Sequence, residues 1–174
     1  MTDLIITYLY FILPAATANM APVICAKLKL PLGIPINEKL FGKNKTYRGF
    51  YSGYLFALVT LALQASLFKQ GTLADYSLID YSQINLFFYA FLFGIGAITG
   101  DAAKSFFKRR LNKKPGSPWP PFDQLDFILS TYIFFLPVDP IPTEIILTIL
   151  LSMLILHPLT NFTAYKLGLK KVWW

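Results

Sequence analysis

Apolar stretches and polar segments alternate along the chain, and five apolar stretches stand out. They run from about residues 4 to 25, 50 to 68, 85 to 103, 125 to 138 and 144 to 165. A helix that crosses a bilayer needs about 20 residues, within a range of about 17 to 25. The stretch at 125–138 is shorter, so it is either a short, steep span or a re-entrant segment buried by its neighbours. The pattern predicts an all-α, polytopic integral membrane protein with about five transmembrane helices, in a single domain over residues 1–174.

The composition also favours a membrane protein. Charged residues make up 14% of the chain and hydrophobic residues 55%, and the mean hydropathy is +0.52. Soluble domains contain about 25% charged residues on average. The single cysteine, Cys25, excludes a disulfide within the chain. Nucleic-acid binding is a poor explanation of the net charge of +7, because no soluble domain remains to present a basic patch.

Basic residues are confined almost entirely to three polar segments. Segments 27–48 and 104–114 hold six each and segment 166–171 holds three, which accounts for 15 of the 16 lysines and arginines. Cytoplasmic loops are the ones enriched in these residues. The pattern therefore predicts an N-terminus outside, a cytoplasmic C-terminus and two long cytoplasmic loops, at about 26–49 and 104–124. Attraction to anionic lipid headgroups explains the same charges without an enzyme, so the charge alone does not indicate catalysis.

Asp101 is the first of three aspartates in the segment 100–127, and it lies at the predicted cytoplasmic end of the third span. If that helix continues, the residues three, four, seven and eight positions later share one face with Asp101; they are Lys104, Ser105, Lys108 and Arg109. A carboxylate at a helix C-terminus is electrostatically unfavourable, and within a span it costs about 2.5 to 3.5 kcal/mol. A bound metal ion would remove that conflict.

Asp123 and Asp126 open the short fourth stretch. Aspartate is a favoured N-cap, but one aspartate would satisfy that role, and two at i and i+3 lie on one helix face. We expect both to share a divalent cation with Asp101. Four prolines between 115 and 121 exclude a regular helix before them and are expected to hold the aspartates in a defined place. Carboxylates that bind a cation, set among lysines and arginines, are typical of chemistry on a nucleoside triphosphate.

The stretch GKNKTYRG at 42–49 combines glycines, a hydroxyl and three cations. It is not a Walker loop, which requires GxxxxGK[ST]. It could bind a triphosphate through its cations and backbone N–H groups, or it could be a solvated basic turn. The sequence of this stretch is compatible with both roles.

Other polar and small residues are assigned structural roles. Asn19, at membrane depth, is expected either to bond to a neighbouring helix, which is the favoured alternative, or to approach the polar site. His157, before a proline, is expected to mark a kink at a helix end. Asn161 begins a glycosylation pattern but falls on the predicted inner side. Gly96 and Gly100, four residues apart, predict close helix packing.

The motifs GKNKTYRG, GDAAKSFFKRR and PFDQLDF, in that order, closely resemble those of CDP-archaeol synthase. The resemblance extends from the LPAATANMAPV stretch of the first span through the fourth span. More distantly, the chain is similar to phosphatidate cytidylyltransferases. Their lysine-aspartate and histidine-glycine-glycine elements are absent, and Pro120 and Pro121 stand near the latter. That departure favours the archaeal branch over one that uses a diacylglycerol phosphate.

The resemblance implies a site as well as a fold. Mg²⁺ is expected at Asp101, Asp123 and Asp126, and Lys108 and Arg109 are expected to act with them in catalysis. The remaining nucleotide- and phosphate-binding residues on the matching motifs would be Lys45, Thr46, Arg48, Gly49, Lys104, Ser105, Arg110 and Gln124. Gln124 stands where the wider family has an arginine, so its role rests on position alone.

The implied reaction is transfer of CMP from CTP to an isoprenoid-ether glycerol phosphate, on the cytoplasmic side of the cell membrane. The expected partners are therefore CTP, this lipid and the bilayer, and not nucleic acid. Two other enzymes are weighed: a CDP-diacylglycerol-type synthase and a CDP-alcohol phosphotransferase, which usually needs more carboxylates. A small ion transporter or channel is the non-enzyme alternative, although it would place carboxylates near mid-span.

Overall fold

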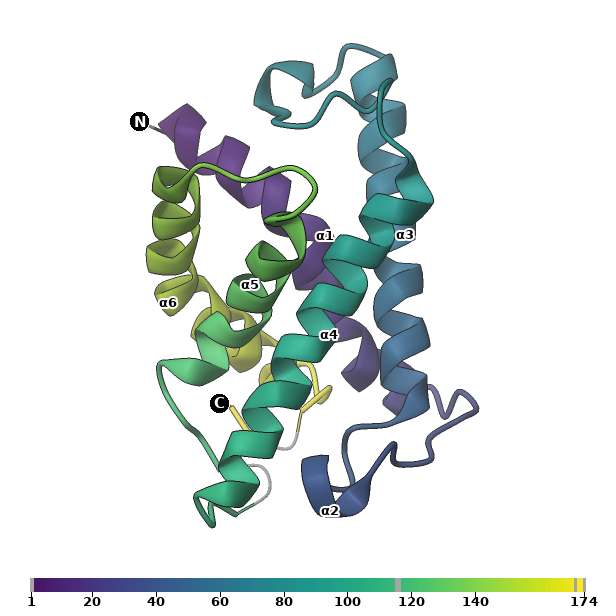
Figure 1. Cartoon of the computed structure of the whole chain (residues 1–174), viewed down its shortest axis with the longest axis vertical. Helices are drawn as coiled ribbons and strands as arrows, with labels where there is room; N and C mark the ends of the chain where they lie inside the picture. The colour runs from purple at the N-terminus through teal and green to yellow at the C-terminus, as the bar shows by residue number, and fades with distance from the viewer. Residues whose placement is uncertain (1, 115–116, 171, 174) are drawn as a thin grey trace.

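The computed structural model describes residues 2–114, 117–170 and 172–173, and in these the chain is helical (Figure 1). Four helices are long: α1 (Thr2–Lys27), α3 (Tyr47–Lys69), α4 (Leu86–Arg110) and α6 (Thr143–Lys166). Two are shorter, α2 (Glu38–Phe41) and α5 (Phe122–Phe135), and a 3-10 turn, η1, covers Ala74–Tyr76. The predicted all-α class is confirmed.

Within the described residues, four helices are long and apolar enough to cross a membrane, namely Asp3–Lys27, Tyr47–Lys69, Leu86–Arg110 and Thr143–Lys166. They coincide with four of the five predicted stretches. The remaining stretch also forms a helix, α5, but it has only 14 residues. At 1.5 Å per residue it is about 21 Å long, which is less than the roughly 30 Å of a hydrocarbon core. Four of the predicted stretches are thus helices that could span a bilayer by length and composition, and α5 is the short element that its sequence predicted.

The three basic segments lie toward one end of the helical bundle. In Figure 1 the segment that carries α2, the segment between α4 and α5, and the C-terminal end of α6 are all in the lower half of the view. The connections between α3 and α4 and between α5 and α6 lie at the upper end. The basic segments therefore lie away from the α3–α4 connection, which contains Asp75 and Asp80, and from the α5–α6 connection, which contains Asp139.

Helix α4 lies at the centre of the bundle and packs on α1, α3 and α5. Its Phe93 contacts Phe11 of α1 and Phe135 of α5, with ring centroids 5.3 Å and 4.7 Å apart. All three rings are buried. These aromatic contacts hold α1, α4 and α5 together.

Two glycines of α4 allow α5 to approach closely. A Cβ at Gly96 would lie 3.0 Å from the Cα of Thr131, and a Cβ at Gly100 would collide with the backbone carbonyl of Asp126 and lie 2.7 Å from Ser130 Cβ. The predicted packing role of this glycine pair is confirmed. The same close approach brings Asp126 beside the end of α4 that carries Asp101.

We predict that Gly100→Ala destabilises the protein. Alanine in a helix is normally favoured over glycine by about 1 kcal/mol, but the added methyl group must displace backbone here, and overpacking of this kind costs about 1–3 kcal/mol. Thermal unfolding in detergent should therefore show a lower Tm. Gly49→Ala is the matched control, because its new Cβ would meet Pro22 at an ordinary 3.6 Å. An equal or higher Tm for Gly100→Ala than for the control would show that α4 and α5 do not need this contact.

Candidate active site

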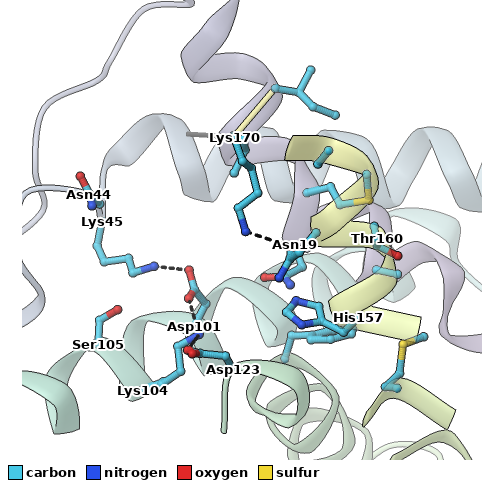
Figure 2. Close-up of a pocket in the computed structure, with 18 of the residues that line it drawn as sticks. Asn19, Asn44, Lys45, Asp101, Lys104, Ser105, Asp123, His157, Thr160 and Lys170 are labelled. Atoms are coloured by element: carbon cyan, nitrogen blue, oxygen red, sulfur yellow. Dashed lines mark hydrogen bonds and ion pairs between the residues drawn. The ribbon is translucent and has the colours of Figure 1, made fainter. Parts of the chain in front are cut away.

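A cavity of about 630 Å³ lies between α1, α4, α6 and the segment that precedes α3 (Figure 2). The residues that line it are apolar toward one end and charged toward the other. Toward the N-terminal part of α1 the lining is apolar, with Leu9, Ile12 and Leu13 facing Met153 and Leu156 of α6. At the other end the lining is charged and comes from the predicted site segments. The cavity thus joins an apolar groove to a cluster of ionised side chains.

Helix α4 continues to Arg110, well past the apolar part of its sequence. The continuation places Asp101, Lys104, Ser105 and Lys108 in the cavity wall, as the spacing of these residues predicted. Lys108 is 7% exposed, which is unusual for a lysine without ionic partners. Burial of these charges requires the pairing described next.

Lys104 is the centre of the charged cluster. Its Nζ lies 3.2 Å from Oδ1 of Asp101, 3.0 Å from Oδ1 of Asp123 and 2.7 Å from Oδ2 of Asp126. The Lys104 side chain is 13% exposed, and that of Asp126 is 6% exposed. One ammonium group therefore holds together the three aspartates singled out in the sequence.

Two further lysines complete the cluster, one from segment 27–48 and one from segment 104–114. Lys45 donates to and pairs with Asp101. Lys108 Nζ donates to Oδ1 of Asp123 and to the carbonyl oxygen of Ser117, both at 2.8 Å. Three lysines thus balance three aspartates in formal charge. The cluster therefore requires lysines from both segment 27–48 and segment 104–114.

Asp123 ties the segment before α5 to that helix. It lies in the first turn, where a carboxylate is favoured by the helix dipole. The N-cap position is Pro121, which offers no side-chain cap, so the N-cap explanation considered for Asp123 does not apply. Its Oδ2 accepts instead from the backbone N–H of Trp119. In the described part of the proline-rich segment, residues 117–121 form no helix, as predicted; Pro115 and Gly116 lie outside the described residues.

The three carboxylates are chemically suited to a hard divalent cation, because carboxylate oxygens are ligands that Mg²⁺ accepts. All three also lie around one positive group, the Lys104 ammonium. Oδ2 of Asp126 is buried and makes no hydrogen bond apart from its ion pair. Among the residues that the structure describes, however, no group of three or more His, Cys, Asp or Glu side chains is arranged to hold a metal ion. A cation could bind between the aspartates only if Lys104 Nζ left its position.

The other predicted residues divide into two groups. Ser105 and Arg109 line the cavity, and Arg109 Nε is buried with no hydrogen-bond partner among the described residues. Arg110 and Gln124 line neither this cavity nor its neighbour: Arg110 lies over the Phe106 ring at 4.9 Å, and Gln124 Oε1 is buried without a hydrogen bond in the described structure.

The stretch GKNKTYRG contributes to both the fold and the cavities. Thr46 is the N-cap of α3 and accepts from the backbone N–H of Gly49 at 3.2 Å. Arg48 Nη1 donates to the carbonyl of Leu30 at 2.7 Å. All three residues line a neighbouring cavity of about 480 Å³, which also contains Lys45 and Asp101. Thr46 thus has a clear capping role, and Arg48 is held near the cluster from a second side.

Four further residues line the cavity, and of these only Asn19 was considered for the polar site from the sequence, as the less favoured alternative. Asn19 of α1, His157 and Asn161 of α6, and Lys170 beyond α6 line the large cavity. Asn19 and His157 are polar residues within apolar stretches of the sequence, which is the feature that could have indicated a place in the cavity. That signal could not show that α1 and α6 face the aspartates across one space, because this depends on how the helices pack.

Comparisons with known proteins agree with this geometry. The whole chain, residues 1–174, matches the family model described as CarS-like, CDP-archaeol synthase. A protein of Methanocaldococcus jannaschii named CDP-archaeol synthase is 37% identical over 188 aligned positions, covering 98% of each chain. One of the same name from Pyrococcus furiosus is 36% identical and covers 95% of each chain.

One solved structure is similar over most of the chain. It is described as an intramembrane enzyme for archaeal membrane lipids biosynthesis. It superposes with a TM-score of 0.68 at 25% sequence identity, covering 88% of this chain and 91% of the other. The helical arrangement in Figure 1 is therefore one that an intramembrane enzyme adopts.

We predict that Lys104→Met destabilises the protein strongly in the absence of divalent cations. Removing one member of a buried ionic group leaves uncompensated charges and costs about 3–5 kcal/mol. Mg²⁺ should raise the Tm of this variant more than that of the unmodified protein, because the three carboxylates still need a cation. Thermal unfolding with and without Mg²⁺ measures both effects.

The control for this prediction is Lys43→Met. Lys43 pairs with Glu38 at 3.5 Å, but the two side chains are 81% and 57% exposed, and exposed pairs contribute only about 0–1 kcal/mol. Equal Tm values for the two variants, or an identical response to Mg²⁺ in Lys104→Met and the unmodified protein, would contradict the central role of Lys104.

Proposed function

Because the chain belongs to the CDP-archaeol synthase family, whose members are cytidylyltransferases of archaeal lipid biosynthesis, we propose the following reaction. The protein transfers CMP from CTP to 2,3-bis-O-(geranylgeranyl)-sn-glycerol 1-phosphate, which gives unsaturated CDP-archaeol and pyrophosphate. One observation carries this proposal: a single cavity joins an apolar groove to a cluster of lysines, an arginine and aspartates. The cavity matches a lipid substrate at one end and a nucleotide at the other.

The groove suits isoprenoid chains. It is formed by the apolar residues of α1 and α6 that line the cavity, and both helices are candidate membrane spans. Chains that remain in the bilayer can enter between two such helices without leaving an apolar environment. The phosphate at the end of the lipid would then reach the polar end of the cavity.

The charged end suits a triphosphate. Lys45, Lys108 and Arg109 line the cavity around Asp101, and a guanidinium group binds phosphate oxygens in a bidentate fashion. Arg48 approaches Asp101 and Lys45 from the neighbouring cavity. We assign Lys45, Arg48, Lys108 and Arg109 to the phosphates of CTP, with Lys104 joining them when it leaves the aspartates.

The chemistry needs no general base. A phosphate monoester has a second pKa near 6, so the lipid phosphate is already largely dianionic at neutral pH. One of its oxygens forms a bond to the α-phosphorus of CTP, the bond from that phosphorus to the bridging oxygen breaks, and pyrophosphate leaves with the electron pair. The lysines and Arg109 hold both phosphates and stabilise the charge on the leaving group.

Mg²⁺ is the metal that we assign to Asp101, Asp123 and Asp126. When bound, it would supply positive charge to the triphosphate. Lys104 then has two functions: it neutralises the aspartates before the metal arrives, and afterwards it is close enough to bind phosphate.

We place the charged end on the cytoplasmic side of the cell membrane, with the N-terminus outside and α5 as a fifth, short membrane element. The distribution of basic residues supports this orientation, as does the position of all three basic segments toward one end of Figure 1. CTP is a cytoplasmic substrate, so the orientation and the reaction require each other.

The alternatives weighed from sequence fit less well. An ion channel or transporter would not need three aspartates of α4 and α5 that are each paired with a lysine. A CDP-alcohol phosphotransferase is disfavoured by the family match over the whole chain. A CDP-diacylglycerol-type synthase uses the same nucleotide and differs only in its lipid, so a direct comparison of lipid substrates must separate the two.

The reaction can be tested with the purified protein in nanodiscs supplied with radiolabelled CTP and Mg²⁺. We expect label to enter the lipid fraction, with an equal amount of pyrophosphate, when the isoprenoid-ether glycerol 1-phosphate is present. A diacylglycerol phosphate should be a poorer acceptor. Absence of pyrophosphate release with either lipid would contradict the proposed function.

The aspartates can be tested one by one. Asp101→Asn, Asp123→Asn and Asp126→Asn should each lower the rate by more than about tenfold, which is a loss of about 1.4 kcal/mol, because each removes charge that a hard cation requires. Asp139→Asn is the control, since the Asp139 carboxylate accepts from the Tyr89 hydroxyl, at 3.1 Å, and lines neither of the two cavities described above. A variant that keeps more than a tenth of the activity would remove that aspartate from the proposed metal site.

The orientation can be tested by cysteine labelling. Cys25 is the only native cysteine and is buried, so Lys113→Cys and Tyr76→Cys can be placed separately in a Cys25→Ser background. An impermeant maleimide should label position 76 in intact cells and position 113 only in inside-out vesicles. Labelling of both positions from one side would contradict the proposed topology.

A further inference from the structure

Lys170, from the third basic segment, lines the same cavity as the cations of segments 27–48 and 104–114. The backbone turns back after α6: Gly168 adopts a positive φ of 66°, and the backbone N–H groups of Leu169 and Lys170 both donate to the carbonyl of Ala164, at 2.8 Å and 3.3 Å. Lys27 at the end of α1 donates to the carbonyl of Gly168 at 3.1 Å. This turn directs Lys170 back over the last turns of α6 rather than away from the protein.

The side chain of Lys170 is held in place inside the cavity. Its Nζ donates to Oδ1 of Asn161 at 2.9 Å, and both residues line the cavity together with Asn19 of α1 and Thr160 of α6. Figure 2 shows Lys170 extending toward the space beside Asp101 and Lys104. Burial and then the charge of Lys104 lower the pKa of Lys170, whereas Asp123 and Asp101 oppose that shift. Lys170 is thus close enough to interact electrostatically with the aspartate cluster.

The position of Lys170 along the cavity determines which phosphate it can meet. The acceptor phosphate is covalently attached to apolar chains, so it must lie where the lining changes from apolar to polar. On the α1 and α6 side, polar residues enter the lining after Leu13 and Leu156, although Met20, Val23 and Ile24 of α1 also line this part of the cavity. These polar residues are Thr17, Asn19, His157, Thr160, Asn161 and Lys170. The cations on the other side, Lys45, Lys108 and Arg109, come from the segments assigned to CTP.

We propose that Lys170, held by Asn161, binds the phosphate of the lipid acceptor and so separates acceptor recognition from CTP binding. This inference rests on the proposed function, because it names a binding residue for one of its two substrates. Its charge would orient the acceptor phosphate toward the α-phosphate of CTP and offset the repulsion between two anionic substrates. Asn161 serves as a positioning residue, since it fixes the direction of the lysine.

The test measures lipid binding without CTP and therefore without catalysis. The probes are the isoprenoid-ether glycerol 1-phosphate and the same diether glycerol without its phosphate, each titrated against the protein in nanodiscs. The unmodified protein should bind the phosphorylated lipid at least about tenfold more tightly, a difference of about 1.4 kcal/mol. Lys170→Met should reduce this preference to less than about threefold, and Lys170→Arg should retain most of it, because the charge remains.

Two further variants separate a specific contact from general effects of charge. Lys166→Met removes a lysine only four residues away that is exposed and lies over the Phe162 ring at 5.5 Å, so it should keep the full preference. Asn161→Ala should reduce the preference partly, because Lys170 loses its acceptor. Each variant is first compared with the unmodified protein by its Tm, and Asn161→Ala provides a folded test of the site if Lys170→Met unfolds.

The outcomes separate this inference from the proposed function. Lys170→Met could keep the tenfold preference for the phosphorylated lipid, or it could weaken CTP binding as much as lipid binding. Either result would show that Lys170 does not bind the acceptor phosphate specifically. A lack of preference in the unmodified protein overturns the inference in the same way. If the preference is present and depends on Lys170 but no CMP is transferred, the phosphate site stands and the proposed reaction fails.

Discussion

The contact between the Lys104 ammonium and three aspartates is the interaction on which the rest of this site depends. Its Nζ lies within 3.2 Å of carboxylate oxygens from Asp101, Asp123 and Asp126. Three carboxylates brought together from α4 and α5 would repel one another in a medium of low polarity. The shared ammonium removes that repulsion and fixes the ends of α4 and α5 relative to each other. The protein can therefore hold a ready set of carboxylates without a metal ion.

This constraint links packing in the bundle to chemistry in the cavity. Asp126 can reach Lys104 only because Gly100 allows α5 to lie directly against α4. Helix α5 has only 14 residues, and it begins in the lower half of Figure 1, where the basic segments lie. The aspartates thus lie beside the apolar groove rather than in the outer loops, which suits a reaction between a soluble nucleotide and a phosphate attached to membrane chains.

The sequence predicted the parts of the site that depend on local spacing. Periodicity placed Lys104 and Lys108 on the face of Asp101, and the resemblance in three motifs led to the family and its chemistry. The sequence did not predict that Lys104 Nζ would lie where the metal was expected, because the direction of a flexible side chain depends on the surrounding charges. It also did not place Lys170 in the cavity, since that requires the turn at Gly168 and the packing of α6 against α1.

A structure of the protein in a lipid bilayer with CTP and Mg²⁺ would test the central claim most directly. We expect the triphosphate in the large cavity, in contact with Lys45 and Arg109, with Mg²⁺ on the aspartates and Lys104 Nζ moved from between them toward phosphate. A triphosphate bound elsewhere, while Lys104 still bridges all three aspartates, would contradict the assignment of this cluster as the site of CMP transfer.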